Sequence, residues 1–245
     1  MVRRRCRSSG CPASGSTRPV PPPNSNNVTV PASLFLFDLD GTLVDSRVDI
    51  ARAVNLTFQD LGLPPKPDTL IYGYVGHGVR RLIMNAVESE EPALINRALA
   101  NFENHYLAHL LDTTHLYPGV ADLLSGLPDS RMAIVTNKPH HYALKILEGL
   151  NILDRFDLVI GGTPDRRMKP DPQMVTEALE TLEVDPSDAL LIGDSAADIG
   201  AARAAGVRSC AVGYGLSPVE EVQAAFPDFF TATVADLAAL LGVRP

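Results

Sequence analysis

The chain has 245 residues, enough for one large domain or two modest ones, and its 45% apolar and 20% charged residues are typical of a globular protein. The net charge of −8 disfavours nucleic acid as a partner. No apolar run approaches the roughly 18–20 residues of a membrane span, so we expect no membrane partner. The three cysteines form no disulfide or zinc pattern, which favours a reducing, cytoplasmic setting.

Residues 1–33 differ in composition from the rest of the chain. They hold five arginines and no acid, so they carry +5 and leave −13 for the remainder. They are rich in Ser, Pro and Asn and have too little apolar surface to fold, so we predict a disordered N-terminal tail over 1–33. They lack the apolar segment of a secretory signal. The absence of acids loosely resembles a transit peptide, but a disordered extension or an upstream start is favoured.

The first predicted strand, Leu34–Phe37, is followed by a long helical segment. Apolar residues recur at three- and four-residue spacing over 48–61, 79–87 and 92–111, and no strand-like run interrupts them. Loop-rich boundaries lie near Asp45-Ser46 and at 116–119. We therefore predict an all-helical cap domain over 46–116, inserted between 34–45 and 117–245.

The remainder of the chain alternates short apolar runs with helical patterns. Strands are predicted over 132–135, 158–160, 189–192 and 209–212, and helices over 139–149, 172–182, 196–205 and 218–225. This βαβα order implies a parallel sheet that is covered on both faces. The predicted fold class is α/β, a Rossmann-like parallel sheet core formed by 34–45 and 117–245, with the helical cap inserted.

Polar residues follow the predicted strands at the points where they end. Because the carboxyl ends of parallel strands meet at one edge of a sheet, these residues are expected to converge. Acids can hold a divalent cation, and a hydroxyl and an ammonium can hold anionic oxygens. The converging residues are Asp38 and Asp40, Thr136-Asn137-Lys138, Lys169, Asp194 and Asp198.

Four short motifs in chain order resemble those of the haloacid dehalogenase-like superfamily, and within it the phosphoglycolate phosphatase-like group with a helical cap. The resemblance covers about residues 34–242. Each motif alone is weak, but all four in order, with a helical insert after the first, form a specific signal. The motifs are Phe37-Asp38-Leu39-Asp40-Gly41-Thr42-Leu43-Val44-Asp45-Ser46, Val135-Thr136-Asn137-Lys138, Lys169-Pro170 and Gly193-Asp194-Ser195-Ala196-Ala197-Asp198.

The resemblance implies catalytic and metal-binding roles for the acids. Asp38 would be the nucleophile and become an aspartyl-phosphate. Asp40 would be the general acid that protonates the leaving group and then the base that activates water. Mg²⁺ would be held by Asp38, the main-chain carbonyl of Asp40 and Asp194, and Asp198 would support this shell through Lys169 or water.

The resemblance also implies substrate-binding residues. Thr136 and Lys169, with Asn137 beside them, would bind the phosphoryl oxygens. In the cap, the glycine-rich segment 72–78 and the arginines after it lead to the hypothesis that Gly76, His77 and Arg80 or Arg81 contact the leaving group, one cation meeting a substrate carboxylate. The alternative is that these glycines only bend the chain and the arginines only face solvent.

These features predict a Mg²⁺-dependent phosphatase that acts on a small phosphorylated metabolite, with 2-phosphoglycolate as the first candidate. A phosphomutase for a sugar phosphate, or a non-catalytic module of the same fold, stays open as an alternative. A dehalogenase is disfavoured, because relatives of that type need no metal and lack the second acid. Either a monomer or a homodimer is compatible with the sequence.

Overall fold

A computed structural model describes residues 29–127 and 130–243 of the protein. Of the predicted disordered tail over 1–33, residues 1–28 lie outside the described residues. Within the described residues 29–33, Val30 is buried, and Val30 and Ser33 are hydrogen-bonded to the rest of the chain. The amide of Val30 donates to the carbonyl of Leu240 at 2.9 Å, and the amide of Ser33 donates to Asp188 at 2.8 Å.

The centre of the molecule is a six-stranded sheet in which every neighbouring pair is parallel, with the order β5-β4-β1-β6-β7-β8. The predicted α/β class is confirmed. β1 lies in the middle of the sheet, between β4 and β6, so the residue that follows it emerges at the centre of the carboxyl edge. The strands are β1 Leu34–Phe37, β4 Arg131–Pro139, β5 Leu158–Gly162, β6 Ala189–Gly193, β7 Arg208–Val212 and β8 Phe229–Thr231.

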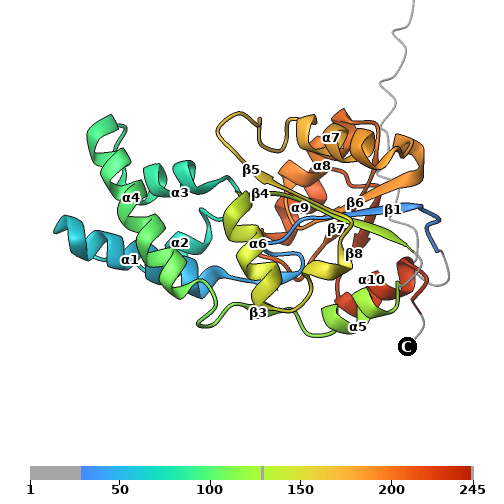
Figure 1. Cartoon of the computed structure of the whole chain (residues 1–245), viewed down its shortest axis with the longest axis horizontal. Coiled ribbons are helices and arrows are strands. Elements are labelled where there is room, and N and C mark those ends of the chain that lie inside the picture. Colours follow the sequence, from blue (N-terminus) through green and yellow to red (C-terminus); the bar gives the residue numbers. More distant parts are fainter. Residues whose placement is uncertain (1–28, 128–129, 244–245) are drawn as a thin grey trace, which may run out of the picture.

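Helices cover both faces of the sheet, since successive strand residues point to opposite sides. Leu34 and Leu36 of β1 pack with α7 and α8, whereas Phe35 and Phe37 belong to the core on the other face. Figure 1 shows α7 and α8 on one side of the sheet, and α5 and α10 on the other. The helices are α5 Val120–Ser125, α6 His140–Gly149, α7 Gln173–Leu182, α8 Ala196–Ala204, α9 Val219–Ala224 and α10 Val234–Leu240, with short 3₁₀ turns at Leu153–Arg155 and Pro186–Asp188.

Four further helices lie between β1 and the rest of the sheet in chain order. They are α1 Arg47–Leu61, α2 Asp68–Tyr72, α3 Val79–Val87 and α4 Pro92–His109. They form a group beside the carboxyl edge of the sheet (Figure 1), and we refer to these four helices and their loops as the cap. β2 Val44–Asp45 leads into them and pairs antiparallel with β3 His115–Leu116, which leads out.

The packing of α1 explains how the cap is built. The apolar residues Ile50, Val54 and Phe58 recur every four residues and are buried, so one face of the helix belongs to the core. The helix ends at Gly62 in the left-handed conformation, where the amide of Leu63 donates to the carbonyl of Phe58. Within residues 29–127 and 130–243, no helix combines the length and apolarity that crossing a membrane requires.

Candidate active site

The site begins where the central strand ends. Asp38 directly follows β1, and its amide donates to the carbonyl of Ile192 in β6 at 2.9 Å, which continues the sheet bonding by one residue. Asp194 directly follows β6. The two acids therefore emerge from neighbouring parallel strands at the same edge, as the strand-end pattern predicts.

Three buried carboxylates meet at this edge. Asp38, Asp194 and Asp198 each offer an oxygen, and these oxygens lie within 4.8 Å of one another. Asp198 is at the start of α8, where both of its oxygens are already bonded. Oδ2 accepts from the amide and hydroxyl of Ser195 at 3.0 and 2.5 Å, and Oδ1 accepts from Lys169. Asp38 and Asp194 are thus the better ligands for a cation.

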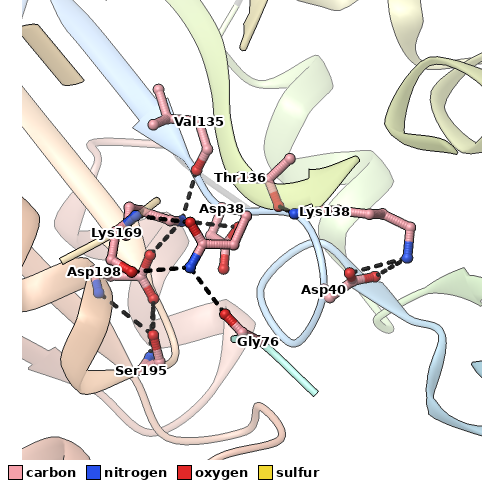
Figure 2. Close-up of polar contacts among 10 residues, drawn as sticks. Asp38, Asp40, Gly76, Val135, Thr136, Lys138, Lys169, Ser195 and Asp198 are labelled. Carbon is pink, nitrogen blue, oxygen red and sulfur yellow. Dashed lines mark hydrogen bonds and ion pairs between the residues drawn. The ribbon is translucent and has the colours of Figure 1, made fainter. Parts of the chain in front are cut away.

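Lys169 is the cation that the structure places against this cluster. Its Nζ lies 3.0 Å from Asp38 Oδ1 and 2.5 Å from Asp198 Oδ1, and it donates to the carbonyl of Val135 at 2.7 Å (Figure 2). Burial alone would lower the pKa of Lys169, but the carboxylates of Asp198 and Asp38 outweigh burial and raise it. Lys169 therefore stays charged and offsets part of the negative charge at the edge.

The positive charge of Lys169 does not fully balance the negative charges of Asp38, Asp194 and Asp198. Burial, partly opposed by Lys169 and reinforced by Asp198, raises the pKa of Asp38 to about 6. Burial, with the charges of Asp198 and Asp38, raises the pKa of Asp194 to about 8. Crowded buried carboxylates with raised pKa values fit a site for a divalent cation, which would favour their ionised forms.

The surroundings of Asp194 also fit a cation site. Its Oδ2 accepts from the amides of Leu216 and Ser217 at 2.7 and 3.3 Å. Because both bonds go to Oδ2, the other oxygen, Oδ1, is available to bind a metal. A side chain at Gly41 would collide with this carboxylate, and Gly41 also has a φ of +83°. Only glycine permits both the turn after Asp40 and the approach to Asp194.

The carboxylate of Asp40 does not join the cluster of three. Its Oδ1 accepts from the hydroxyl of Ser46 at 2.5 Å, and Lys138 Nζ lies 2.9 and 3.0 Å from its two oxygens. Figure 2 shows Asp40 and Lys138 on one side of Asp38, with Lys169 and Asp198 on the other. The carboxylates of Asp38, Asp40 and Asp194 therefore do not all point at one position, and an Asp40 contact to a metal would have to come from its main chain.

Thr136 and Asn137 are buried at the end of β4 and line the same pocket as Asp38. The amide group of Asn137 is fully engaged: its Nδ2 donates to the carbonyls of Gly76 and Lys169 at 3.0 and 3.1 Å, and its Oδ1 accepts from the amide of Lys169 at 2.8 Å. Asn137 thus connects the loop of Lys169 with the loop that precedes α3.

Cap residues line part of the pocket that holds Asp38 and Asp40. Its lining from the cap is mostly apolar or aromatic and includes Ile50, Tyr74, Val75, Gly76, Gly78, Val79, Leu82, Phe102 and Tyr106. The structure brings Gly76 to the pocket but not His77 or Arg80. Both of these side chains are exposed, and Arg80 donates to Asn96 at 3.4 Å.

Three site residues were given no role from the sequence: Lys138, which was expected at the edge, and Ser46 and Tyr106. Lys138 had a recognisable signal, since it follows Thr136-Asn137 at the end of an apolar strand. Ser46 closes the first motif. Tyr106 had no local signal, because its position on the buried face of α4 is that of any core aromatic residue.

Comparison with known proteins agrees with this geometry. The family model described as haloacid dehalogenase-like hydrolase matches residues 35–212. The chain belongs to this family. The match spans both Asp38 and Asp198, so it includes all four strand-end motifs.

Curated relatives cover most of the chain. A phosphoglycolate phosphatase of Nitrosospira multiformis is 36% identical over 83% of this chain and 95% of its own length. One of Chromobacterium violaceum is 38% identical over 82% of this chain and 92% of its own. The crystal structure of a predicted phosphoglycolate phosphatase from Haemophilus somnus 129pt, at 29% identity, covers 84% of this chain and 96% of its own with a TM-score of 0.79.

Proposed function

We propose that the protein is a Mg²⁺-dependent phosphatase that hydrolyses a small phosphate monoester, with 2-phosphoglycolate as the first candidate. The observation that carries this proposal is the contact of Lys169 Nζ with Asp38 Oδ1 at 3.0 Å, beside the buried carboxylate of Asp194. A nucleophile, a cation for phosphoryl oxygens and a metal ligand thus lie together. The relatives from Nitrosospira multiformis and Chromobacterium violaceum carry the name of this activity.

The first step would transfer the phosphoryl group to Asp38. An oxygen of Asp38 forms a bond to phosphorus while the bond from phosphorus to the glycolate oxygen breaks. The electron pair of the broken bond stays on the glycolate oxygen, and Asp40 gives that oxygen its proton. Because an alkoxide is a poor leaving group, this proton is needed as the bond breaks.

The second step would release phosphate. Asp40, now a carboxylate, takes a proton from a water molecule whose oxygen bonds to phosphorus, and the bond between Asp38 and phosphorus breaks with its electrons returning to Asp38. The proposed Mg²⁺ ligands are Asp38, the main-chain carbonyl of Asp40 and Asp194. When bound, the ion would supply positive charge that lowers the repulsion between the phosphate and Asp38.

The remaining residues have proposed supporting roles. Lys169 and Thr136 would bind phosphoryl oxygens, Asn137 would hold the loop of Lys169, and Asp198 would orient Lys169. Contacts of His77 and Arg80 with the leaving group remain a prediction, which His77→Ala and Arg80→Ala test through kcat/KM for phosphoglycolate. The proposed partner is the phosphorylated metabolite. The proposed setting is the cytoplasm, where a reducing environment suits a free cysteine such as the buried Cys210.

The experiment that tests this function measures phosphate release from 2-phosphoglycolate with Mg²⁺ for the wild type and Asp38→Asn. We expect the variant to lose at least about 10³-fold in kcat, because the nucleophile is gone. Asp60→Asn is the control, since Asp60 lies at an exposed position of α1, where it pairs with His105 of α4. Equal activity of wild type and Asp38→Asn would exclude the proposed enzyme. Release of phosphate without a bisphosphate activator would exclude a mutase.

A further inference from the structure

We infer that Lys138 is a positioning residue for Asp40, and that the hydroxyl of Tyr106 in the cap holds Lys138 in place. The inference rests on the proposed function, in which Asp40 protonates the leaving group. It concerns a residue whose ammonium group contacts Asp40 and Tyr106 and neither Asp38 nor Asp194, and it gives the cap a direct connection to the acid.

The contacts of Lys138 define this role. Its ammonium group has three donors, and three acceptors surround it: the two oxygens of Asp40 at 2.9 and 3.0 Å and the hydroxyl of Tyr106 at 2.8 Å. The side chain of Lys138 is 3% exposed and that of Asp40 is 9% exposed. Two of the three donors of Lys138 point to Asp40 and the third to Tyr106, so its position is suited to orient the carboxylate of Asp40.

The position of Asp40 explains why orientation matters. Its carboxylate is held by Lys138 from β4 and by Ser46 from the segment that enters the cap. Two contacts from different segments fix the rotation of the carboxylate about its last bond, which decides whether its proton points to the leaving oxygen. Misplacing a reacting group by about 1 Å can cost on the order of 10²-fold in rate.

Tyr106 links this pair to the cap. It lies on α4, is 1% exposed, and packs against Phe102 and Tyr142 with ring centroids 5.3 and 5.0 Å away. A ring held on two sides keeps its hydroxyl at a fixed point, so Lys138 receives its third acceptor only while α4 lies against the sheet edge. The cap thereby contributes to the orientation of Asp40.

The test compares two substrates that differ in their need for an acid. The leaving group of phosphoglycolate is an alkoxide, the glycolate oxygen, whereas that of 4-nitrophenyl phosphate is a stable phenolate that needs little protonation. We expect Lys138→Met to lower the single-turnover rate of glycolate release from phosphoglycolate by about 10- to 100-fold and that of 4-nitrophenolate release from 4-nitrophenyl phosphate by less than about 3-fold. The rate of this first step is measured because hydrolysis of the aspartyl-phosphate, in which Asp40 acts as the base, is common to both substrates. Tyr106→Phe should show the same selectivity with a smaller loss, and Lys138→Arg should recover part of the activity.

Three further variants make the outcomes distinguishable. Lys145→Met, at an exposed position of α6, and Tyr72→Phe, in α2 away from the pocket lining, should leave both rates unchanged. Asp40→Asn should show the largest selectivity.

If Asp40→Asn is selective but Lys138→Met lowers both rates equally, or lowers neither, the inference is wrong and the proposed function stands. If Asp40→Asn is not selective, Asp40 is not the acid, and both the inference and the mechanism in the proposed function are wrong. Should Lys138→Met not fold, as its thermal melt would reveal, Tyr106→Phe decides: unchanged or equally lowered rates overturn the inference.

Discussion

The side-chain amide of Asn137 donates a 3.0 Å hydrogen bond to the main-chain carbonyl of Gly76, so the end of β4 is bonded directly to the loop that precedes α3. The same side chain makes two bonds with the main chain of Lys169. One buried amide therefore joins the cap, β4 and the loop that carries Lys169. This connection makes the position of Lys169 sensitive to the loop at Gly76.

Asn137→Ala is expected to lower both stability and substrate affinity. The variant leaves main-chain groups of Lys169 and Gly76 without their partner, which costs about 1–3 kcal/mol of unfolding free energy. KM for phosphoglycolate should rise, because Lys169 loses the bonds that hold its loop. Urea unfolding and steady-state kinetics measure the two effects. Asn96→Ala, on the exposed face of α4, is the control. Wild-type values of both quantities for Asn137→Ala would refute the bridging role.

Gly41→Ala is expected to abolish activity while leaving a folded protein of reduced stability. The added Cβ would meet the carboxylate of Asp194, and alanine would also be strained at a φ of +83°. Gly62→Ala is a matched control, because Gly62 also has a positive φ, +68°, but no atom lies within 4 Å of the added Cβ. It should cost only about 1 kcal/mol of unfolding free energy and keep full activity. Active Gly41→Ala would argue against the tight approach of Gly41 to Asp194.

Stability without metal is expected to fall as pH rises from about 4 to about 8. The pKa of Asp38 is raised to about 6 and that of Asp194 to about 8, so the folded state holds more protons than the unfolded state in this range. The stabilisation is fully present below the unfolded pKa and is lost as pH rises through the folded values. Thermal melts in EDTA across this range measure the effect.

Mg²⁺ should reverse that loss. An ion held as proposed would bind only the folded state and compete with protons for the same carboxylates, so the rise in Tm on adding millimolar Mg²⁺ should be larger at pH 8 than at about pH 5. Asp194→Asn should remove most of the rise, whereas Asp60→Asn should keep it. A Tm that does not respond to Mg²⁺ at either pH would count against a shared metal site.

Asp49 is expected to stabilise the junction between the cap and the sheet. It is buried at the start of α1 and accepts from the amides and hydroxyls of Thr113 and Thr114, at 2.7–3.1 Å. Asp49→Ala should lower the unfolding free energy by about 3 kcal/mol. Asp112→Ala, which removes an exposed partner of Arg52, should cost less than about 1 kcal/mol.

The effect of Asp49 should also depend on pH. Burial would raise the pKa of Asp49, but the hydrogen bonds from Thr113 and Thr114 outweigh burial and lower it. Its contribution to stability is therefore present above the unfolded pKa and is lost as pH falls through the folded value. The difference in urea midpoint between wild type and Asp49→Ala should shrink on acidification to about pH 3. A difference that does not change with pH would refute this account.

Much of the fold followed from local pattern. The strands at Leu34–Phe37 and Ala189–Gly193 were predicted within one residue, because an apolar run bounded by polar residues identifies a buried strand without knowledge of its neighbours. α2, α5, β8 and α10 were not predicted. Each has three to seven residues, too few for a periodic signal, and they depend on packing against the rest of the molecule.

Sequence alone determined which residues gather at the carboxyl edge, because strand order and parallel direction bring strand ends together whatever their side chains do. Asp38 and Asp194, which directly follow β1 and β6, needed no more than that. Only the tertiary structure decided which partners each side chain takes. The carboxylate of Asp40 lies beside Lys138 and Ser46 instead of Asp194, and Tyr106 reaches Lys138 from a helix 32 residues away in the chain. Such contacts depend on side-chain rotation and on how the cap docks, and neither leaves a local pattern in the chain.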